Sequence, residues 1–119
     1  MKIATCNGCF GKLHAGHLFF FGFALASTHG GKLVVGINSD EYIKRVKQYN
    51  HIPELQRKEL IEELNITDRV VVFNEDNACK FIEIIMPHIH CIGEEYKGNC
   101  PEEVLCKKLG IEIVYIPRI

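Results

Sequence analysis

The amino-acid sequence predicts an α/β fold, in which a five-stranded parallel sheet carries helices on both faces. Segments typical of strands and of helices alternate along the whole chain, and such alternation produces right-handed crossovers and a parallel sheet. The run from Lys32 to Asn38 is apolar almost throughout, which is typical of an interior strand covered on both faces. The chain has 119 residues, enough for one core and too few for two, so we expect a single domain over residues 1–119.

The expected strands are short apolar segments that end beside turn-forming residues. Gly8 breaks the first strand and Gly93 ends the fourth, as strand-to-loop turns require. The five strands are expected at residues 2–7, 32–38, 69–73, 89–92 and 111–116. This arrangement is the three-layer, Rossmann-like form of the α/β class.

The expected helices begin and end at recognisable signals. Pro53 and Pro101 open helices, Pro87 stops one, and Ser39 or Asp40 can cap another. The helices are expected at residues 15–28, from about 40 to 47, and at 54–64, 78–86 and 101–109.

Two of these helices carry apolar patterns that predict their packing. The helix from Ala15 to Thr28 is apolar nearly all round, so we expect burial on several sides. The helix that begins at Glu54 shows an amphipathic stripe, which predicts that the stripe faces the sheet; its members are Leu55, Leu60, Ile61 and Leu64.

Composition excludes a general nucleic-acid binder. Fourteen Lys and Arg residues stand against 15 Asp and Glu, for a net charge of −1, and nucleic-acid binders normally carry a basic excess. Any phosphate site must therefore be local.

Six cysteines raise the question of a disulfide framework. The sequence shows no charged segment followed by an apolar export segment, so we expect reduced thiols and a cytoplasmic location. The longest apolar stretch, Leu18 to Ala26, is nine residues long, far below the roughly 20 needed to cross a bilayer. We expect no membrane partner.

A glycine-rich loop with two histidines lies where the first strand meets its helix. His14 and His17 are three residues apart at a helix start, so both rings can face one side, and the helix N-terminus offers free N–H groups. Gly8 and Gly16 let the backbone approach a ligand closely. Because open parallel sheets bind ligands at this edge, the loop is expected to bind phosphate.

The stretch from Asn7 to Phe10, followed by Leu13 to His17 with its His-x-Gly-His motif, resembles the signature of the cytidylyltransferase-like nucleotidyltransferases. Residues 36–40, 44–47, 73–76 and 93–97 resemble further segments of the same family, so nearly the whole chain is covered. The resemblance is closest to heptose-1-phosphate adenylyltransferase domains, followed by glycerol-3-phosphate cytidylyltransferases.

The resemblance implies that the chain joins a nucleoside monophosphate from CTP or ATP to a sugar or polyol phosphate, with release of pyrophosphate. By the same resemblance, the catalytic residues are His14, His17 and Lys47. The residues expected to bind nucleotide are Gly8, Cys9, Phe10, Gly16, Lys44, Arg57, Gly93, Glu94 and Arg118. Mg²⁺ is expected to arrive with the triphosphate, with no dedicated metal site in the protein. A homodimer is expected by analogy with relatives.

Two features depart from the family pattern. Gly11 stands where relatives usually have aspartate, and that carboxylate would tune the histidines or organise the loop. The chain as given also stops before the Ser/Thr-rich helix start of relatives, so we expect weaker triphosphate binding.

Several alternatives stay open. Cys6 and Cys9 form a C-x-x-C pair that suggests a redox or metal site. His88, His90 and Cys91 suggest a metal site too, although core packing is the better interpretation for residues flanking a buried strand. The chain can also be a catalytically impaired nucleotide-binding or regulatory module, or an adenylyltransferase for a cofactor precursor such as a flavin.

Overall fold

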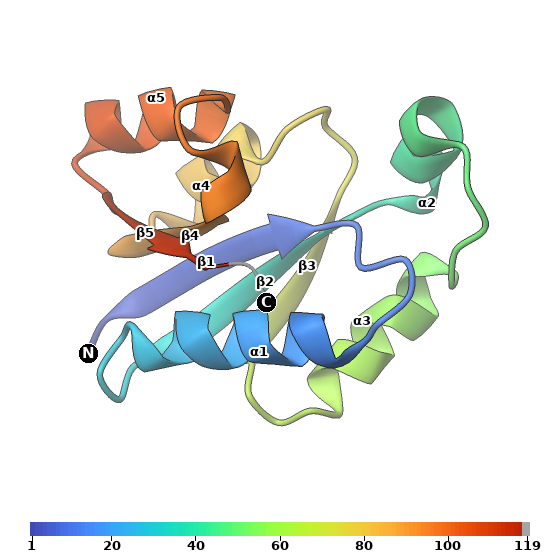
Figure 1. The fold of residues 1–119 in the computed structure, drawn as a ribbon, viewed down its shortest axis with the longest axis horizontal. Helices are drawn as coiled ribbons and strands as arrows, with labels where there is room; N and C mark the ends of the chain where they lie inside the picture. Colours follow the sequence, from blue (N-terminus) through green and yellow to red (C-terminus); the bar gives the residue numbers. More distant parts are fainter. Residues whose placement is uncertain (118–119) are drawn as a thin grey trace.

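The computed structural model describes residues 1–117, and its centre is a five-stranded parallel sheet (Figure 1). The strands are β1 (Ile3–Gly8), β2 (Lys32–Asn38), β3 (Arg69–Phe73), β4 (Ile89–Gly93) and β5 (Glu112–Ile116). They lie in the order β3-β2-β1-β4-β5. The predicted three-layer α/β fold is therefore confirmed.

The helices cover both faces of this sheet (Figure 1). One face carries α1 (Ala15–Ala26) and α3 (Glu54–Glu62), and the other carries α4 (Cys79–Ile85) and α5 (Pro101–Leu109). Between β2 and α3 lie the short helix α2 (Asp40–Tyr42), capped by the Ser39 hydroxyl, and the π-helical turn η1 (Ile43–Lys47). A 3₁₀ turn, η2 (Glu94–Tyr96), follows β4.

Alternating strand residues divide the core in two, because successive side chains point to opposite faces of a sheet. Ala4, Cys6 and Cys91 pack on the side of Phe21 and Ile61, which belong to α1 and α3. Val34 and Phe73 face the other way, into a cluster with α4 and α5 residues. Thr5 and His90 are neighbours in the sheet register, and their alternation with the first group places them on the α4–α5 face.

The order in which the chain adds strands changes direction in the sheet between β1 and β4. From β1 the chain adds β2 and β3 on one side, and then returns to add β4 and β5 on the other. A parallel sheet forms its ligand crevice at such a switch point, outside the carboxyl ends of the strands. The β1–α1 loop, with its two histidines, begins at this point.

The packing expectation for α1 is wrong. Only Phe21 and Ala24 are fully covered, whereas Leu18, Phe19 and Phe23 are 44%, 36% and 39% exposed. A helix on the outer layer touches the sheet along one side only, so an all-round apolar sequence leaves apolar side chains in water.

The expected stripe on α3 is also wrong in half of its members. Leu55 and Leu60 are exposed, and the fully buried residues of this helix are Ile61 and Arg57. The helix is therefore rotated so that a guanidinium, which the stripe did not include, faces inward.

All six cysteines are free thiols. Cys6 is buried in the core and Cys9 lies at the cleft described below, and among residues 1–117 no group of three His, Cys, Asp or Glu side chains could hold a metal ion. His90 and Cys91 are buried, as the core interpretation predicts, while His88 is exposed and accepts a hydrogen bond from the Ile3 N–H. Over the same residues, no helix is long and apolar enough to cross a bilayer.

Candidate active site

A cleft of about 1120 Å³ opens at the carboxyl end of the sheet, between the β1–α1 loop, the end of η1 and the segment after β4. Pockets for a single drug-sized ligand usually measure about 300 to 1000 Å³, so this cleft has room for two small substrates. Most of the expected site residues line it together; these are Gly8, Cys9, Phe10, His14, Gly16, His17, Lys47 and Gly93.

The two histidines are fixed by the backbone at the start of α1. The His14 Nδ1 atom accepts the Gly16 N–H at 3.0 Å, and the His17 Nδ1 atom accepts the His14 N–H at 3.2 Å. The rings stack with their centroids 3.9 Å apart. Because each Nδ1 accepts a bond, each neutral ring carries its hydrogen on Nε2, and Nε2 is the nitrogen left for a ligand.

The protonation state of His17 follows from its surroundings. Burial, followed by the neighbouring His14 ring, lowers the pKa of His17. A proton added to Nδ1 of His17 would also break the hydrogen bond from the His14 N–H. His17 therefore favours the neutral form, with a single donor at Nε2.

Glycines in this loop allow the close packing of rings on backbone. A Cβ atom at Gly16 would lie 2.8 Å from the His14 ring, and one at Gly8 would lie 2.9 Å from the Phe10 ring. Phe10 itself has a left-handed backbone with φ of 48°. The centroid of its ring lies 5.2 Å from that of His17 and 5.0 Å from that of Phe21, edge-on in both cases. These contacts hold the loop against the core.

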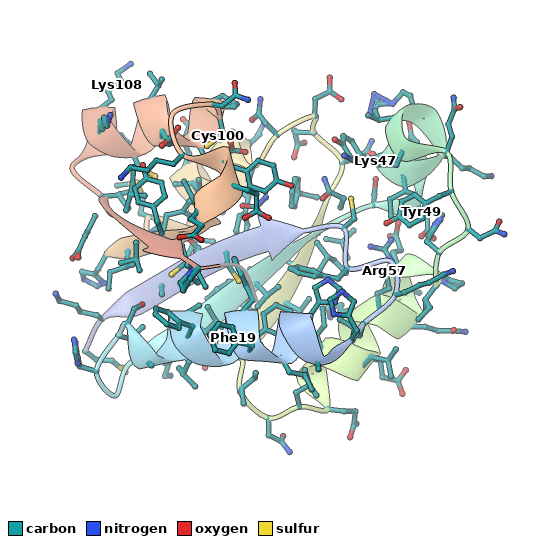
Figure 2. The ribbon with its side chains drawn as sticks, viewed as in Figure 1. Phe19, Lys47, Tyr49, Arg57, Cys100 and Lys108 are labelled. Carbon is teal, nitrogen blue, oxygen red and sulfur yellow. The ribbon has the colours of Figure 1, made fainter. Side chains whose placement is uncertain are left out.

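Arg57 lies beneath the loop and not in the cleft, which corrects its expected place among nucleotide-binding residues (Figure 2). Its side chain is fully buried, with Nη1 donating to the carbonyl oxygens of Cys9 and Asn38, each at 2.7 Å. Nε donates to the Ile52 carbonyl at 2.7 Å, and Nη2 donates to the Asp40 carboxylate at 2.9 Å. One guanidinium thus joins the ends of β1 and β2 to the segment before α3.

Asp40 completes this support. Burial alone would raise its pKa, but hydrogen bonds from the Glu54 N–H, Arg57 and His51 together hold the pKa below the usual value. The His51 Nε2 atom lies 2.9 Å from the carboxylate. The carboxylate is therefore ionised at neutral pH and balances the charge of the buried guanidinium.

Tyr49, in the segment after η1 (Figure 2), fills the space beside Gly11. A Cβ atom at Gly11 would lie 2.5 Å from the Tyr49 hydroxyl oxygen. That hydroxyl shares a hydrogen bond with the Cys9 thiol and receives one from the Gly11 N–H, while burial and then the Cys9 group raise the pKa of Tyr49. Where relatives are expected to carry an aspartate, this chain places a neutral phenol from the neighbouring loop.

The cationic side of the cleft comes from η1. Lys47, at the end of this turn, is exposed and lines the cleft, whereas Lys44 does not. Arg45 pairs with Asp76 at 3.1 Å and lies over the Tyr42 ring. Of the expected cluster, only Lys47 therefore lines the same cleft as the histidines.

Two residues expected to bind nucleotide, Glu94 and Arg118, are not placed in the cleft by the part of the chain that the structure describes. Glu94 does not line the cleft, where its neighbours Glu95 and Tyr96 do, because η2 turns the chain after Gly93. Arg118 lies outside the described residues. Sequence reasoning missed Asn7, Tyr49 and His90, which also line the cleft; a polar residue in the middle of a buried strand was the available signal for His90.

Comparisons with known proteins agree with this geometry. A family model described as cytidylyltransferase-like matches residues 5–116. The bifunctional protein HldE of Helicobacter pylori strain J99 is 42% identical over 113 residues, which is 93% of this chain and 23% of that protein. HldE of Geotalea uraniireducens is 36% identical over 110 residues, or 91% of this chain and 21% of that protein. The chain thus spans about a fifth of the length of these relatives.

Solved structures show the same fold. The lipopolysaccharide core biosynthesis protein from Thermoplasma volcanium is 26% identical, with a TM-score of 0.82, over 100% of this chain and 98% of that one. Pantothenate synthetase from Thermus thermophilus is 13% identical with a TM-score of 0.68, and covers 100% of this chain and 56% of its own. At that identity, the second likeness concerns the fold alone.

Proposed function

This chain belongs to the cytidylyltransferase-like family of nucleotidyltransferases, and on that premise we propose that its cleft transfers a nucleoside monophosphate from CTP or ATP to a sugar or polyol phosphate. The observation that carries the proposal is the histidine pair. Both rings have Nδ1 bound to backbone N–H groups, so two Nε2–H donors remain for one ligand. Two such donors beside a helix N-terminus suit the oxygens of a triphosphate.

The reaction needs charge stabilisation more than covalent chemistry. An oxygen of the acceptor phosphate attacks the α-phosphorus of the triphosphate, the new P–O bond forms, and the bond to the leaving pyrophosphate breaks. Negative charge then spreads over the phosphoryl and leaving oxygens. Donors fixed in place beforehand stabilise this charge without having to reorient, and His14 and His17 are held in that way by the α1 backbone.

Lys47 has the second role in this proposal. Two anionic substrates repel each other as they approach, and Lys47 provides a positive charge on the cleft wall formed by η1. We assign it to the phosphate of the acceptor, because the histidines and the start of α1 take the triphosphate. Its exposed position leaves the ammonium group free to meet an entering phosphate.

Mg²⁺ fits the site as a companion of the triphosphate. Residues 1–117 contain no group of three carboxylate, histidine or thiol side chains that could hold a metal ion. Mg²⁺ usually keeps its waters and binds substrate phosphates with few protein ligands, and it would neutralise phosphate charge. The residues of this chain bind and orient the phosphate oxygens.

A sugar or polyol phosphate is the acceptor class that the relatives support. The Thermoplasma volcanium protein, which matches this chain over nearly its full length, is described as a lipopolysaccharide core biosynthesis protein. The cleft also carries polar side chains away from the histidines, such as Asn7 and Asn77, which suit hydroxyl groups. We also propose a cytoplasmic site of action, which the six free thiols of the chain support.

We also propose that the chain acts as a homodimer. The exposed apolar side chains of α1 and α3, Leu18, Phe23 and Leu55, support an interface next to the first loop. Sedimentation analysis at micromolar concentration should give twice the chain mass of 13.6 kDa, and a single-chain mass would contradict this part.

The test of the reaction is pyrophosphate release. The purified protein is assayed with CTP, ATP, GTP and UTP, each paired with a panel that includes glycerol 3-phosphate and heptose 1-phosphate. We expect release with one nucleotide and one acceptor, dependent on both. Binding of a triphosphate without release for every pair would instead favour the nucleotide-binding module.

A further inference from the structure

His90 is a buried histidine at the floor of the cleft with one nitrogen unused. It is 1% exposed and lines the cleft, on the α4–α5 face of the sheet. Its Nδ1 atom lies 2.7 Å from the Thr5 hydroxyl, which belongs to the neighbouring strand. The nitrogen left for any other partner is Nε2.

This Nε2 atom has no hydrogen-bond partner. Within residues 1–117, two buried side-chain polar atoms are unpartnered, Thr67 Oγ1 and His90 Nε2, and only the second belongs to a residue that lines the cleft. An unpartnered buried polar group costs folding free energy. Its presence at a ligand cleft indicates that a ligand group provides the missing partner.

The surroundings of His90 favour an uncharged partner over a phosphate. Among the described residues that line the cleft, Asp76, Glu95 and Glu102 are acidic, and the two lysines, Lys12 and Lys47, come from the β1–α1 loop and η1. Burial lowers the pKa of His90 to about 4, so the ring is neutral at physiological pH. A neutral ring within β4, which unlike His14 and His17 does not stand at the start of a helix, favours an uncharged group.

We propose that His90 Nε2 hydrogen-bonds a hydroxyl group on the uncharged part of a bound substrate, which makes His90 a specificity-determining residue. This inference rests on the proposed function, because the histidine loop and Lys47 must hold the phosphates at the other end of the cleft. A hydroxyl matches either tautomer of the ring, since it both donates and accepts. Two sources provide such a hydroxyl, the polyol or sugar of the acceptor and the ribose of the nucleotide.

Two substitutions separate the two ring nitrogens. In His90→Asn, the short side chain keeps a polar group near the Nδ1 position for Thr5 but has nothing at Nε2. In His90→Gln, the longer side chain keeps a polar group near Nε2. We expect His90→Asn to lower kcat/KM about 10-fold, the usual result of losing a buried hydrogen bond, and His90→Gln to retain most of the activity.

Deoxy substrates identify the source of the hydroxyl. Wild type and His90→Asn are compared with the best acceptor, with its single-deoxy analogues, and with the 2′-deoxy and 3′-deoxy forms of the nucleotide. Removing the hydroxyl that His90 bonds should lower kcat/KM about 10-fold with the wild-type protein. The same analogue should cause no further loss of kcat/KM with His90→Asn. Equal effects of His90→Asn on every substrate and analogue would overturn the inference.

A second readout does not require turnover. The imidazole nitrogens of His90 in the wild-type protein are followed by NMR while CTP, ATP, glycerol 3-phosphate or heptose 1-phosphate is added. We expect the Nε2 resonance to shift with the probe that provides the hydroxyl. Binding detected at His14 and His17 with no change at His90 for any probe overturns this inference alone, whereas no binding of any probe overturns the proposed function as well.

Discussion

The Nη1 atom of Arg57 lies 2.7 Å from the carbonyl oxygen of Cys9, a residue 48 positions earlier in the chain. This bond ties the loop that carries both histidines to helix α3. The same guanidinium reaches Asn38, Ile52 and Asp40. The shape of the cleft therefore depends on a residue that does not line it.

The first prediction is that Arg57→Met lowers the free energy of unfolding by about 3 kcal/mol or more, because it leaves buried carbonyl oxygens without donors. Turnover should fall as well, since the loop loses its support. Urea denaturation measures the first effect and pyrophosphate release the second. Lys58→Met is the matched control on the same helix, where a partly exposed ion pair with Glu62 contributes under about 1 kcal/mol. An Arg57→Met protein as stable as the control would contradict the role of Arg57.

The second prediction concerns His17. His17→Asn keeps an acceptor near the Nδ1 position for the His14 N–H, but removes the donor at Nε2. Turnover should therefore fall on the order of 100-fold or more, while the free energy of unfolding changes by less than about 1 kcal/mol. His29→Asn is the control, because His29 is exposed with a φ of 50° that asparagine tolerates. Near-normal turnover of His17→Asn would show that the imidazole has no part in the chemistry.

The third prediction couples Gly11 and Tyr49. A Cβ at residue 11 would meet the Tyr49 hydroxyl at 2.5 Å, so Gly11→Ala should displace the phenol from Cys9 and Gly11. We expect Gly11→Ala and Tyr49→Ala to lower turnover by similar factors, and the double variant to be no worse than either. The coupling free energy should be on the order of 1 kcal/mol. Strictly additive effects would mean that the contact between Gly11 and Tyr49 does not affect turnover.

The fourth prediction is a pH dependence of stability. The pKa of His90 is about 4 in the folded chain and about 6.5 when unfolded. Between these values the unfolded chain binds a proton that the native chain does not, so stability falls as the pH drops below about 6.5, by up to about 1.4 kcal/mol per pH unit. The lowered pKa of His17 acts in the same direction. In urea denaturation at pH 7, 6 and 5, His90→Gln should show a shallower loss than wild type, and identical slopes would contradict the burial of a neutral ring.

An apolar pattern predicts the limits of interior strands well. The limits expected for β2 and β3 agree with the structure to the residue, because an interior strand is apolar along its whole length. The apolar pattern did not predict which side chains of α1 and α3 are buried, because it does not show how many sides of a helix are covered. The rotation of α3 depends on Arg57, whose carbonyl partners are the residue after β1, the last residue of β2 and a residue just before α3. No periodicity within the helix contains that information.

The candidate site divides in the same way. The positions of His14, Gly16 and His17 follow from a local motif, so the sequence was enough to group them. Tyr49 and His90 depend on long-range packing. Tyr49 meets Gly11 only because the segment after η1 folds back, with the Ile52 N–H bound to the Gly11 carbonyl at 3.0 Å, and His90 meets the cleft only because β4 lies beside β1.

The left-handed backbone at Phe10 affects how much ordering the loop needs when a substrate binds. A non-glycine residue in this region carries roughly 1 to 2 kcal/mol of strain, and the contacts of its ring with His17 and Phe21, which belong to the chain itself, offset that strain. The loop is therefore preorganised: an arriving triphosphate does not have to freeze a mobile segment, and less of its binding free energy is lost to ordering.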